Sequence, residues 1–420
     1  MGFNVLDTLA KLATESGFAG FFAEGGWQNL VMIVIACVLL YLGIVKGFEP
    51  LLLVGIAFGC LLANVSYFPG LDAVNPDLNA TNALYHPELW EAFLDKNNEF
   101  YHSYGHILSN AGLLDIFYIG VKAGLYPSLI FMGVGAMTDF GPLIADPKSL
   151  LLGAAAQLGV FVAFFGAICL GFTGPQAASI GIIGAADGPT SILVSQVLHS
   201  NYIGPIAVAA YSYMALVPII QPFAIKLVTT KKERAMHMPY NPKHVSRSLR
   251  ICFPIMVTII AGFIAPMSVS LVGFLMFGNL LRECGCLERL SQTAQNDLAN
   301  LITLLLGITI SFSMQADQFV NLKTLIIMAL GLVAFVFDSI AGVMFAKLLN
   351  LFCKNKVNPM VGAAGISAFP MSARVIQKMG QEADCTNHLL MHAVGANVAG
   401  QIASVLAGGM ILNLVPQLMG

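Results

Sequence analysis

Charged residues are scarce in this sequence. Only 10% of its 420 residues are Asp, Glu, Lys or Arg, whereas 57% are hydrophobic and the mean hydropathy is +0.79. A soluble domain carries about 25% charged residues, so this chain has too little polar surface to cover a water-facing globule. The composition excludes an ordinary soluble fold and indicates a membrane protein.

A basic stripe of the kind that binds nucleic acid and a disulfide framework are also missing. A net charge of -2, with no basic stripe interleaved with aromatics, argues against a nucleic-acid partner. The eight cysteines are scattered, mostly inside apolar runs, and are interpreted as small buried hydrophobes. The first apolar run begins near residue 29, after acidic rather than basic residues, so no cleavable signal peptide is predicted. We expect residues 1–28 to form an amphipathic interfacial segment.

Long apolar runs are abundant. Stretches at 30–44, 150–170, 203–228 and 324–349 approach or exceed the roughly 20 residues that span a bilayer. Several such runs in one chain predict a polytopic, all-α membrane protein.

Loop charge predicts the orientation of these spans. The 226–250 loop carries seven basic residues against one acid and is therefore predicted to be cytoplasmic. The 66–112 loop has one lysine against six acids and is predicted to be extracytoplasmic. An odd number of crossings must separate the two loops.

Four apolar segments compete for that odd number: 113–136, 149–171, 176–198 and 203–226. The third is the least apolar, with glycines, a proline and Asp187 near its middle. We predict that it enters and returns as a re-entrant broken helix, which leaves three crossings. Such backbone is tolerated at membrane depth only where protein or an aqueous cavity covers it.

The C-terminal half repeats this plan from the opposite side. After a basic linker at 231–250, residues 251–420 contain apolar runs, a second broken segment at 358–374 and a last crossing near 387–415. The fold class predicted is two inverted repeats, 29–230 and 251–420, each with a re-entrant broken helix. Ion sites of such transporters lie where the breaks meet.

Asp187 is the first candidate site residue. A carboxylate inside an apolar segment costs about 2.5–3.5 kcal/mol on insertion scales, which is tolerated when it holds a cation among oxygen ligands. Gly188 and Pro189 open the helix and free carbonyls as further ligands. The alternative is that Asp187 only caps a half-helix. Asp338, also within an apolar run, is predicted either to face the pore or to cap a bend.

Further polar residues lie in apolar surroundings. Arg374 closes the second broken segment, where it either captures a carboxylate with its planar fork or serves as a positive-inside anchor. Asn358, Ser367 and Asn397 supply neutral oxygens, although each alone is typical of a helix–helix hydrogen bond. Tyr213 is a candidate proton donor or a packing group.

Four motifs resemble the β subunit of sodium-translocating, biotin-dependent decarboxylases, a family that includes oxaloacetate, methylmalonyl-CoA, glutaconyl-CoA and malonate decarboxylase pumps. They are GAADGPTSI at 184–192, AAYSYMALVP at 209–218, the whole of 358–374, and MHAVGANVAG at 391–400. The resemblance covers nearly the whole chain from about residue 28.

The resemblance implies residue roles. Sodium binding falls on Asp187, with the polar cluster Asn358, Gly362, Ser367 and Asn397. Arg374, which would meet carboxybiotin from the cytoplasmic side, and Tyr213, which would exchange a proton, would be catalytic.

The resemblance also implies partners and a location. This chain would decarboxylate carboxybiotin presented by another subunit, since it has no Met-Lys-Met biotin attachment site. It would export sodium from the cytoplasmic membrane, as a homotrimer beside a carboxyltransferase and biotin-carrier α subunit and a small γ subunit. Oxaloacetate is expected as the primary acid, ahead of methylmalonyl-CoA. The alternative is a sodium-coupled secondary transporter or Na+/H+ exchanger without enzymatic activity.

Overall fold

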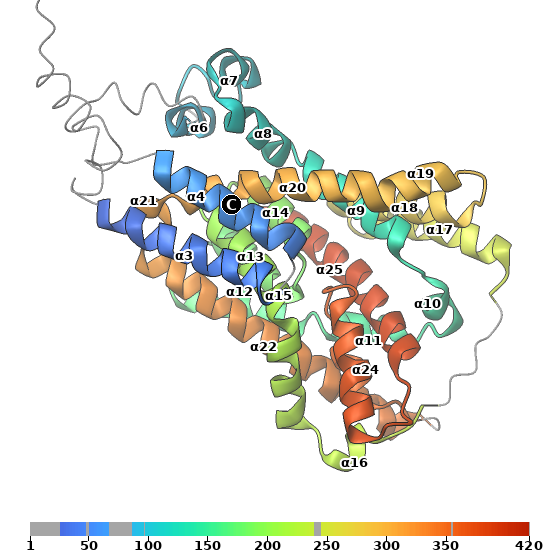
Figure 1. Cartoon of the computed structure of the whole chain (residues 1–420). Helices are drawn as coiled ribbons and strands as arrows, with labels where there is room; N and C mark the ends of the chain where they lie inside the picture. Colours follow the sequence, from blue (N-terminus) through green and yellow to red (C-terminus); the bar gives the residue numbers. More distant parts are fainter. Residues whose placement is uncertain are drawn as a thin grey trace, which may run out of the picture. The chain divides into compact units, whose positions relative to one another are not determined.

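The computed structural model describes residues 26–47, 50–66, 86–95, 97–238, 245–353 and 356–419 (Figure 1). Nearly all of the predicted interfacial segment 1–28 lies outside these residues, as do 67–85 of the acidic loop and 239–244 of the basic linker. Helices and short turns account for the described parts of the chain, and no β-strand occurs in them. The prediction of an all-α protein is confirmed for these parts.

The chain forms two compact units. The first comprises the residues up to Leu125 together with Thr303–Thr324, and the second comprises Tyr126–Ile302 together with Leu325–Gly420. The helices of the first unit are α3 (Gly26–Ile44), α4 (Pro50–Ser66), α6 (Pro87–Leu94), α7 (Tyr104–Asn110), α8 (Leu113–Lys122), η5 (Ser311–Met314) and α21 (Ala316–Phe319).

The second unit holds the greater part of the chain. Its helices are α9 (Leu125–Met137), α10 (Gly141–Ala145), α11 (Ser149–Ala155), α12 (Leu158–Cys169), α13 (Gly174–Gly181), η2 (Ile182–Ala185), α14 (Gly188–Val197), α15 (Ile203–Val228), α16 (Lys231–Arg234), α17 (Arg247–Ile264), η3 (Pro266–Ser268), α18 (Val269–Glu283), α19 (Glu288–Thr293), η4 (Ala294–Leu298), α23 (Pro359–Ala363), α24 (Met371–Ala383) and α25 (Leu390–Met419). Three helices contribute residues to both units: α9, through its first residue Leu125, α20 (Ala299–Ile310) and α22 (Leu322–Phe352).

Several helices are long and apolar enough to cross a membrane. Within the described ranges there are five, or up to seven if each of two bent helix pairs is one span. One bent pair is α8 with α9, and the other lies within α15, where Pro218 cannot donate to the carbonyl of Met214. The outer faces of such helices are apolar: Phe263 of α17 is 86% exposed and Leu351 of α22 is 78% exposed. This surface suits lipid rather than water.

The spans agree with the crossings predicted between residues 112 and 226. Three segments in this part of the chain are long and apolar enough to cross a membrane: the α8–α9 pair, Ser149–Cys169 and the two parts of α15. The segment around Asp187 is not. Instead that segment is divided into α13, η2 and α14. The poor span predicted from glycine, proline and aspartate is therefore a broken helix.

Polar side chains tie together the apolar helices of the first unit. The Asn29 side-chain amide on α3 donates to the Asn64 carbonyl on α4 at 3.1 Å, and the Asn64 amide donates to the Met314 carbonyl at 2.9 Å. Elsewhere in this unit the buried carboxylate of Asp115 accepts hydrogen bonds from the Trp90 indole at 2.7 Å and the Gly112 N–H at 2.9 Å. Buried amides and carboxylates of this kind hold specific helix pairs in register.

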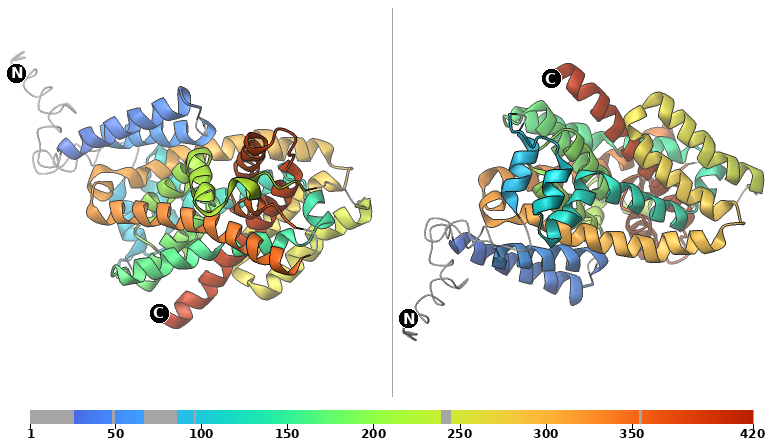
Figure 2. Two further views of the ribbon diagram at one scale, coloured as in Figure 1. Left: turned by 90° about the horizontal axis from the view of Figure 1, so that it is seen from below. Right: turned by 90° about the horizontal axis from the view of Figure 1, so that it is seen from above.

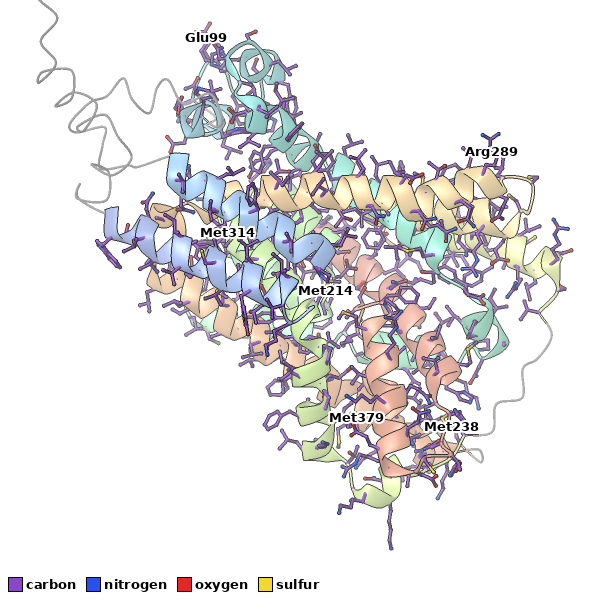
Figure 3. The ribbon with its side chains drawn as sticks, in the orientation of Figure 1. Glu99, Met214, Met238, Arg289, Met314 and Met379 are labelled. Carbon is purple, nitrogen blue, oxygen red and sulfur yellow. The ribbon has the colours of Figure 1, made fainter. Side chains whose placement is uncertain are left out.

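Glycine lets helices of the second unit approach closely. A side chain at Gly365, in the α23–α24 connection, would place its Cβ 2.6 Å from the Leu152 carbonyl oxygen of α11. A Cβ at Gly153 of α11 would lie 2.6 Å from the Gly400 nitrogen of α25. These contacts bring α11, α25 and the connection together around one core, which also holds Met379 of α24, with Met238 packed against it (Figure 3).

Candidate functional site at two broken helices

The first break is built around Asp187. The 3-10 turn η2 ends at Ala185 and is capped by Ala186, whose φ of +52° is left-handed and unusual for a residue other than glycine. Asp187 then caps α14: its Oδ1 accepts a hydrogen bond from the Thr190 N–H at 3.3 Å. Gly188 and Pro189 open the new helix at positions where a missing side chain and a missing N–H are tolerated. The Asp187 residue is 4% exposed.

The other carboxylate oxygen of Asp187 meets two remote segments. Oδ2 accepts hydrogen bonds from the Ser367 hydroxyl at 3.2 Å and from the Ser404 hydroxyl at 2.7 Å. Ser367 lies in the connection between α23 and α24, and Ser404 lies on α25. A backbone bond from the Ser367 N–H to the Ala185 carbonyl, 3.1 Å long, joins the two breaks directly. The structure thus brings Asp187 and Ser367 together.

One face of α25 supplies further oxygens. Asn397, Gln401 and Ser404 follow the helical spacing i, i+4, i+7 and are all buried. The Asn397 amide donates to the carbonyls of Ala364 (3.2 Å) and Ile366 (2.6 Å), which fixes it against the second break. Its Oδ1, like the Oε1 of Gln401, has no hydrogen-bond partner among the residues that the structure describes. Such buried acceptors are unusual unless an ion or a water completes them.

Ser404 and Gln401 were not predicted as site residues. A signal existed in the sequence, because both follow Asn397 on the same helical face within an apolar run. α25 is one continuous helix of 30 residues, and it ends at the C-terminus marked in Figure 2.

Asn358 and Gly362 lie on α23 and make other contacts. Asn358 caps α23 by accepting from the Met360 N–H at 3.0 Å, and its amide donates to the carbonyls of Arg234 (3.1 Å) and Met236 (2.8 Å). Gly362 packs so closely on Gly342 of α22 that a side chain at either would overlap the other's carbonyl. Both residues hold the short helix α23 in place, and no hydrogen bond in the described parts of the chain joins Asn358 to Asp187.

Tyr211, rather than Tyr213, lies beside Gly188 at the start of α14. The Tyr213 hydroxyl donates to the Met328 carbonyl of α22, and its ring lies in an apolar cluster with Ile183. The Tyr211 ring instead fills the space beside Gly188, where a Cβ would meet its Cδ1 at 2.7 Å. The buried Tyr211 hydroxyl has no hydrogen-bond partner among the described residues. It is therefore a candidate site group that the sequence reasoning missed.

Arg374 lies in the first turn of α24 and is exposed to solvent, as is Lys378 one turn later. Beyond them, the helix reaches a charged region where α16 and the end of α24 meet. There the Lys347 ammonium, 2.8 Å from Glu233, holds the pKa of Glu233 below its ordinary value. Hydrogen bonds from Thr386, aided by His237, lower the pKa of Asp384 to about 2. Arg374 is thus placed between the second break and a polar surface.

These features define a helical membrane protein in which two broken helices enclose a buried carboxylate. A family model described as Na+-transporting oxaloacetate decarboxylase beta subunit matches residues 28–415. The chain is 51% identical over 416 residues to methylmalonyl-CoA decarboxylase subunit beta of Propionigenium modestum, covering 98% of this chain and 100% of the relative. It is 47% identical over 407 residues to glutaconyl-CoA decarboxylase subunit beta of Acidaminococcus fermentans, covering 97% of each chain.

A third relative carries another acid in its name. The chain is 46% identical over 420 residues to the probable oxaloacetate decarboxylase beta chain of Vibrio cholerae, covering 93% of this chain and 96% of the relative. This chain belongs to the family of Na+-transporting decarboxylase β subunits, and the resemblance predicted from its motifs is confirmed. It is the sodium-pumping membrane subunit of a biotin-dependent decarboxylase.

Proposed function

We propose that this chain binds the transported sodium ion at Asp187 and couples its release to decarboxylation of carboxybiotin at Arg374. The observation that carries the ion site is the Asp187 carboxylate, buried at the first break with hydroxyls from two remote segments on Oδ2. A charged side chain inside an apolar protein is costly and marks a functional site. In a chain of this family, the function proposed for Asp187 is to bind the transported sodium ion.

The surrounding groups fit sodium. A hard cation prefers carboxylate, hydroxyl and carbonyl oxygens. Ser367 and Ser404 can each donate to Oδ2 and still offer a lone pair to a cation. Asn397 Oδ1 and Gln401 Oε1 add neutral oxygens that lack a partner among the described residues. Asn358 and Gly362 contribute by fixing α23, and proton exchange at Tyr213 stays a prediction.

Arg374 is proposed to hold the carboxylate of carboxybiotin. Its exposed guanidinium offers paired donors that match a carboxylate, and the exposed Lys378 adds a second positive charge on the same face of α24. Arg374 lies seven positions after Ser367 in the chain. Ser367 contacts Asp187 and lies in the connection that leads directly into the first turn of α24, where Arg374 is. A movement of Ser367 at the ion site therefore also moves Arg374, which is proposed to hold the carboxylate of carboxybiotin.

The coupling must be tight on energetic grounds. Moving one charge against ~100 mV costs about 2.3 kcal/mol, and a tenfold concentration gradient adds about 1.4 kcal/mol. Export of two ions would therefore require roughly 7 kcal/mol, taking both terms together. Carboxybiotin must be decarboxylated at Arg374 only when the sodium site is occupied. Otherwise the free energy of decarboxylation is released without exporting sodium.

An inverted repeat is the architecture proposed for this coupling, with the boundaries 29–230 and 251–420 and a cytoplasmic linker at 231–250. The order of elements supports it. A long apolar segment, a broken pair and a long helix occur as α11–α12, α13–α14, α15 and again as α22, α23–α24, α25. If the two breaks enter from opposite sides, their contact through Ser367 and Ala185 lies near the middle of the membrane.

The acid is proposed to be chosen by a partner subunit. Identity to relatives does not sort by acid: one methylmalonyl-CoA subunit is 51% identical, another is 45%, and an oxaloacetate chain is 46%. This is expected if the β subunit acts only on carboxybiotin. The relatives are named as β subunits or β chains, which supports α and γ partner subunits. The biotin carried by the α subunit, a homotrimer of this chain and its place in the cytoplasmic membrane are proposed from the family resemblance alone.

The test is sodium uptake by the reconstituted complex. The chain is purified with its partners, placed in vesicles, and supplied in turn with oxaloacetate, methylmalonyl-CoA and glutaconyl-CoA while uptake of radioactive sodium is followed. One acid should drive uptake in the wild type and not in Asp187→Asn. Uptake by the Asp187→Asn complex at the wild-type rate would contradict the proposed ion site. Uptake with no acid dependence would contradict the coupling.

A further inference from the structure

A pair of thiols lies in the turn that follows α18, outside the candidate site. Cys284 comes directly after the last residue of α18, and Gly285 separates it from Cys286. Cys286 is exposed and Cys284 is partly exposed, so neither is the buried hydrophobe expected from the sequence. Exposed cysteines are open to reagents in the surrounding water, whereas buried structural ones are inert.

The turn brings the two thiols together. Two Cα atoms separated by one residue are at most roughly 7 Å apart in a fully extended chain, and the left-handed φ of +71° at Gly285 turns the chain back. A disulfide requires a Cα separation of about 4.4–6.8 Å. The side chains of Cys284 and Cys286 are hydrogen-bonded to each other. This spacing permits a disulfide between them.

A positive charge lies against the same turn. The Arg247 Nη2 donates to the Cys284 carbonyl at 2.8 Å, and a Cβ at Gly285 would lie 2.7 Å from this nitrogen. The charge of Arg247 also favours the thiolate form of Cys286. Arg247 belongs to the 226–250 loop, which is predicted to be cytoplasmic. Thiols in the cytoplasm are kept reduced, and disulfides that form there are usually transient and redox-sensing.

Hydrogen bonding makes Cys284 the more acidic of the two thiols. Burial raises its pKa, but hydrogen bonds from the N–H groups of Cys286 and Leu287 and from the Cys286 thiol outweigh burial, so the pKa of Cys284 lies below its ordinary value. The pKa of Cys286 is raised instead, because its thiol donates to Cys284 and because a second negative charge beside Cys284 is unfavourable. The thiolate is the nucleophile in thiol chemistry. Cys284 therefore reacts first.

We propose that Cys284 and Cys286 form a redox-active dithiol whose substrate is a low-molecular-weight disulfide. The Cys284 thiolate attacks one sulfur of that disulfide, which forms a mixed disulfide and releases one thiol. Cys286 then loses its proton and attacks the Cys284 Sγ, which closes the protein disulfide and releases the second thiol. The two cysteines are oxidised by two electrons, and the small disulfide is reduced to two thiols. This activity is independent of the sodium site and of Arg374.

The experiment follows thiol oxidation in the intact complex. The reduced wild-type complex is mixed with glutathione disulfide, remaining thiols are blocked with a maleimide at successive times, and the digested peptides are weighed by mass spectrometry. The peptide with Cys284 and Cys286 should lose the mass of two hydrogens while the exposed Cys385 still carries a free thiol. Loss of free thiol at Cys385 that is as fast as at the pair, or faster, would overturn the proposal.

Two variants assign the roles within the pair. Cys286→Ser should stop at the mixed disulfide on Cys284, because the second thiol is missing. Cys284→Ser should react several times more slowly, since it lacks the more acidic thiol. Equal rates in the two variants would overturn the assignment of Cys284 as the attacking group. Closure of a disulfide in the wild type requires neither variant, so the main result stands or falls even if a variant does not fold.

Discussion

Ser404→Ala tests whether the hydroxyl nearest to Asp187 holds the sodium site together. The substitution removes the 2.7 Å hydrogen bond to Oδ2 and deletes only one oxygen atom from α25. A hydrogen bond to a charged group contributes about 1.5–3 kcal/mol, and about 1.4 kcal/mol corresponds to a tenfold change in an equilibrium constant. Ser367 still donates to the same oxygen at 3.2 Å, so the lower end of the range applies. The half-saturating sodium concentration should rise about tenfold.

The assay is the rate of decarboxylation by the complete complex as sodium is varied. Turnover at saturating sodium should remain close to wild type, because the role proposed for Ser404 is at the ion site beside Asp187 and not at Arg374. Ser195→Ala is the matched control: Ser195 of α14 is equally buried, and its hydroxyl has no partner among the described residues. Ser367→Ala should fall between the two, since its hydrogen bond is longer. The reasoning is refuted if Ser404→Ala and Ser195→Ala share the same half-saturating sodium concentration.

Three other outcomes are expected. Asp187→Asn should abolish sodium-dependent decarboxylation while the complex still assembles, because asparagine can accept the Thr190 N–H; near-normal turnover at saturating sodium would remove Asp187 from the mechanism. Arg374→Lys keeps the charge but loses the paired donors, so turnover should fall more than sodium binding, and unchanged kinetics would leave Arg374 as a charged anchor. Gly362→Ala should lower the melting temperature of the complex, since its Cβ would overlap the Gly342 carbonyl; a melting temperature equal to wild type would show that α22 and α23 can separate without loss.

The sequence predicted the breaks more reliably than the rotation of the helices around them. Glycine, proline and aspartate together marked the Asp187 segment, because each disfavours a continuous apolar helix in a different way. Tyr211 and Tyr213 illustrate the limit. They are two residues apart and so lie on nearly opposite faces of α15, and hydropathy does not decide which face meets the break. Packing of Tyr211 into the space beside Gly188 decides it.

Ser404 is a part of the candidate site that could not be predicted from its position in the sequence. Ser404 lies seven residues after Asn397, and small hydroxyl residues are common in apolar helices, where they often bond to their own backbone. Only the approach of α25 to both breaks distinguishes Ser404 from such residues. Asn358 shows the opposite case, since its motif position suggested a ligand while its contacts are those of a helix cap holding Arg234 and Met236. Hydroxyl and amide side chains can either bind an ion or hold a helix in place. Only their neighbours in the folded protein distinguish the two roles.

The distance along the chain between Asp187 and its partners has a consequence for synthesis. Ser367 and Ser404 follow Asp187 by 180 and 217 positions. At a synthesis rate of about 5–20 residues per second, roughly 10–40 s pass before Ser404 has been made. During that interval the Asp187 carboxylate lacks the hydroxyl groups of both Ser367 and Ser404. The helices α13 and α14 must therefore stay at the membrane surface or in the insertion machinery, or Asp187 must be protonated. Completion of the buried site is then a late checkpoint of biogenesis, which a chain truncated before α25 never passes.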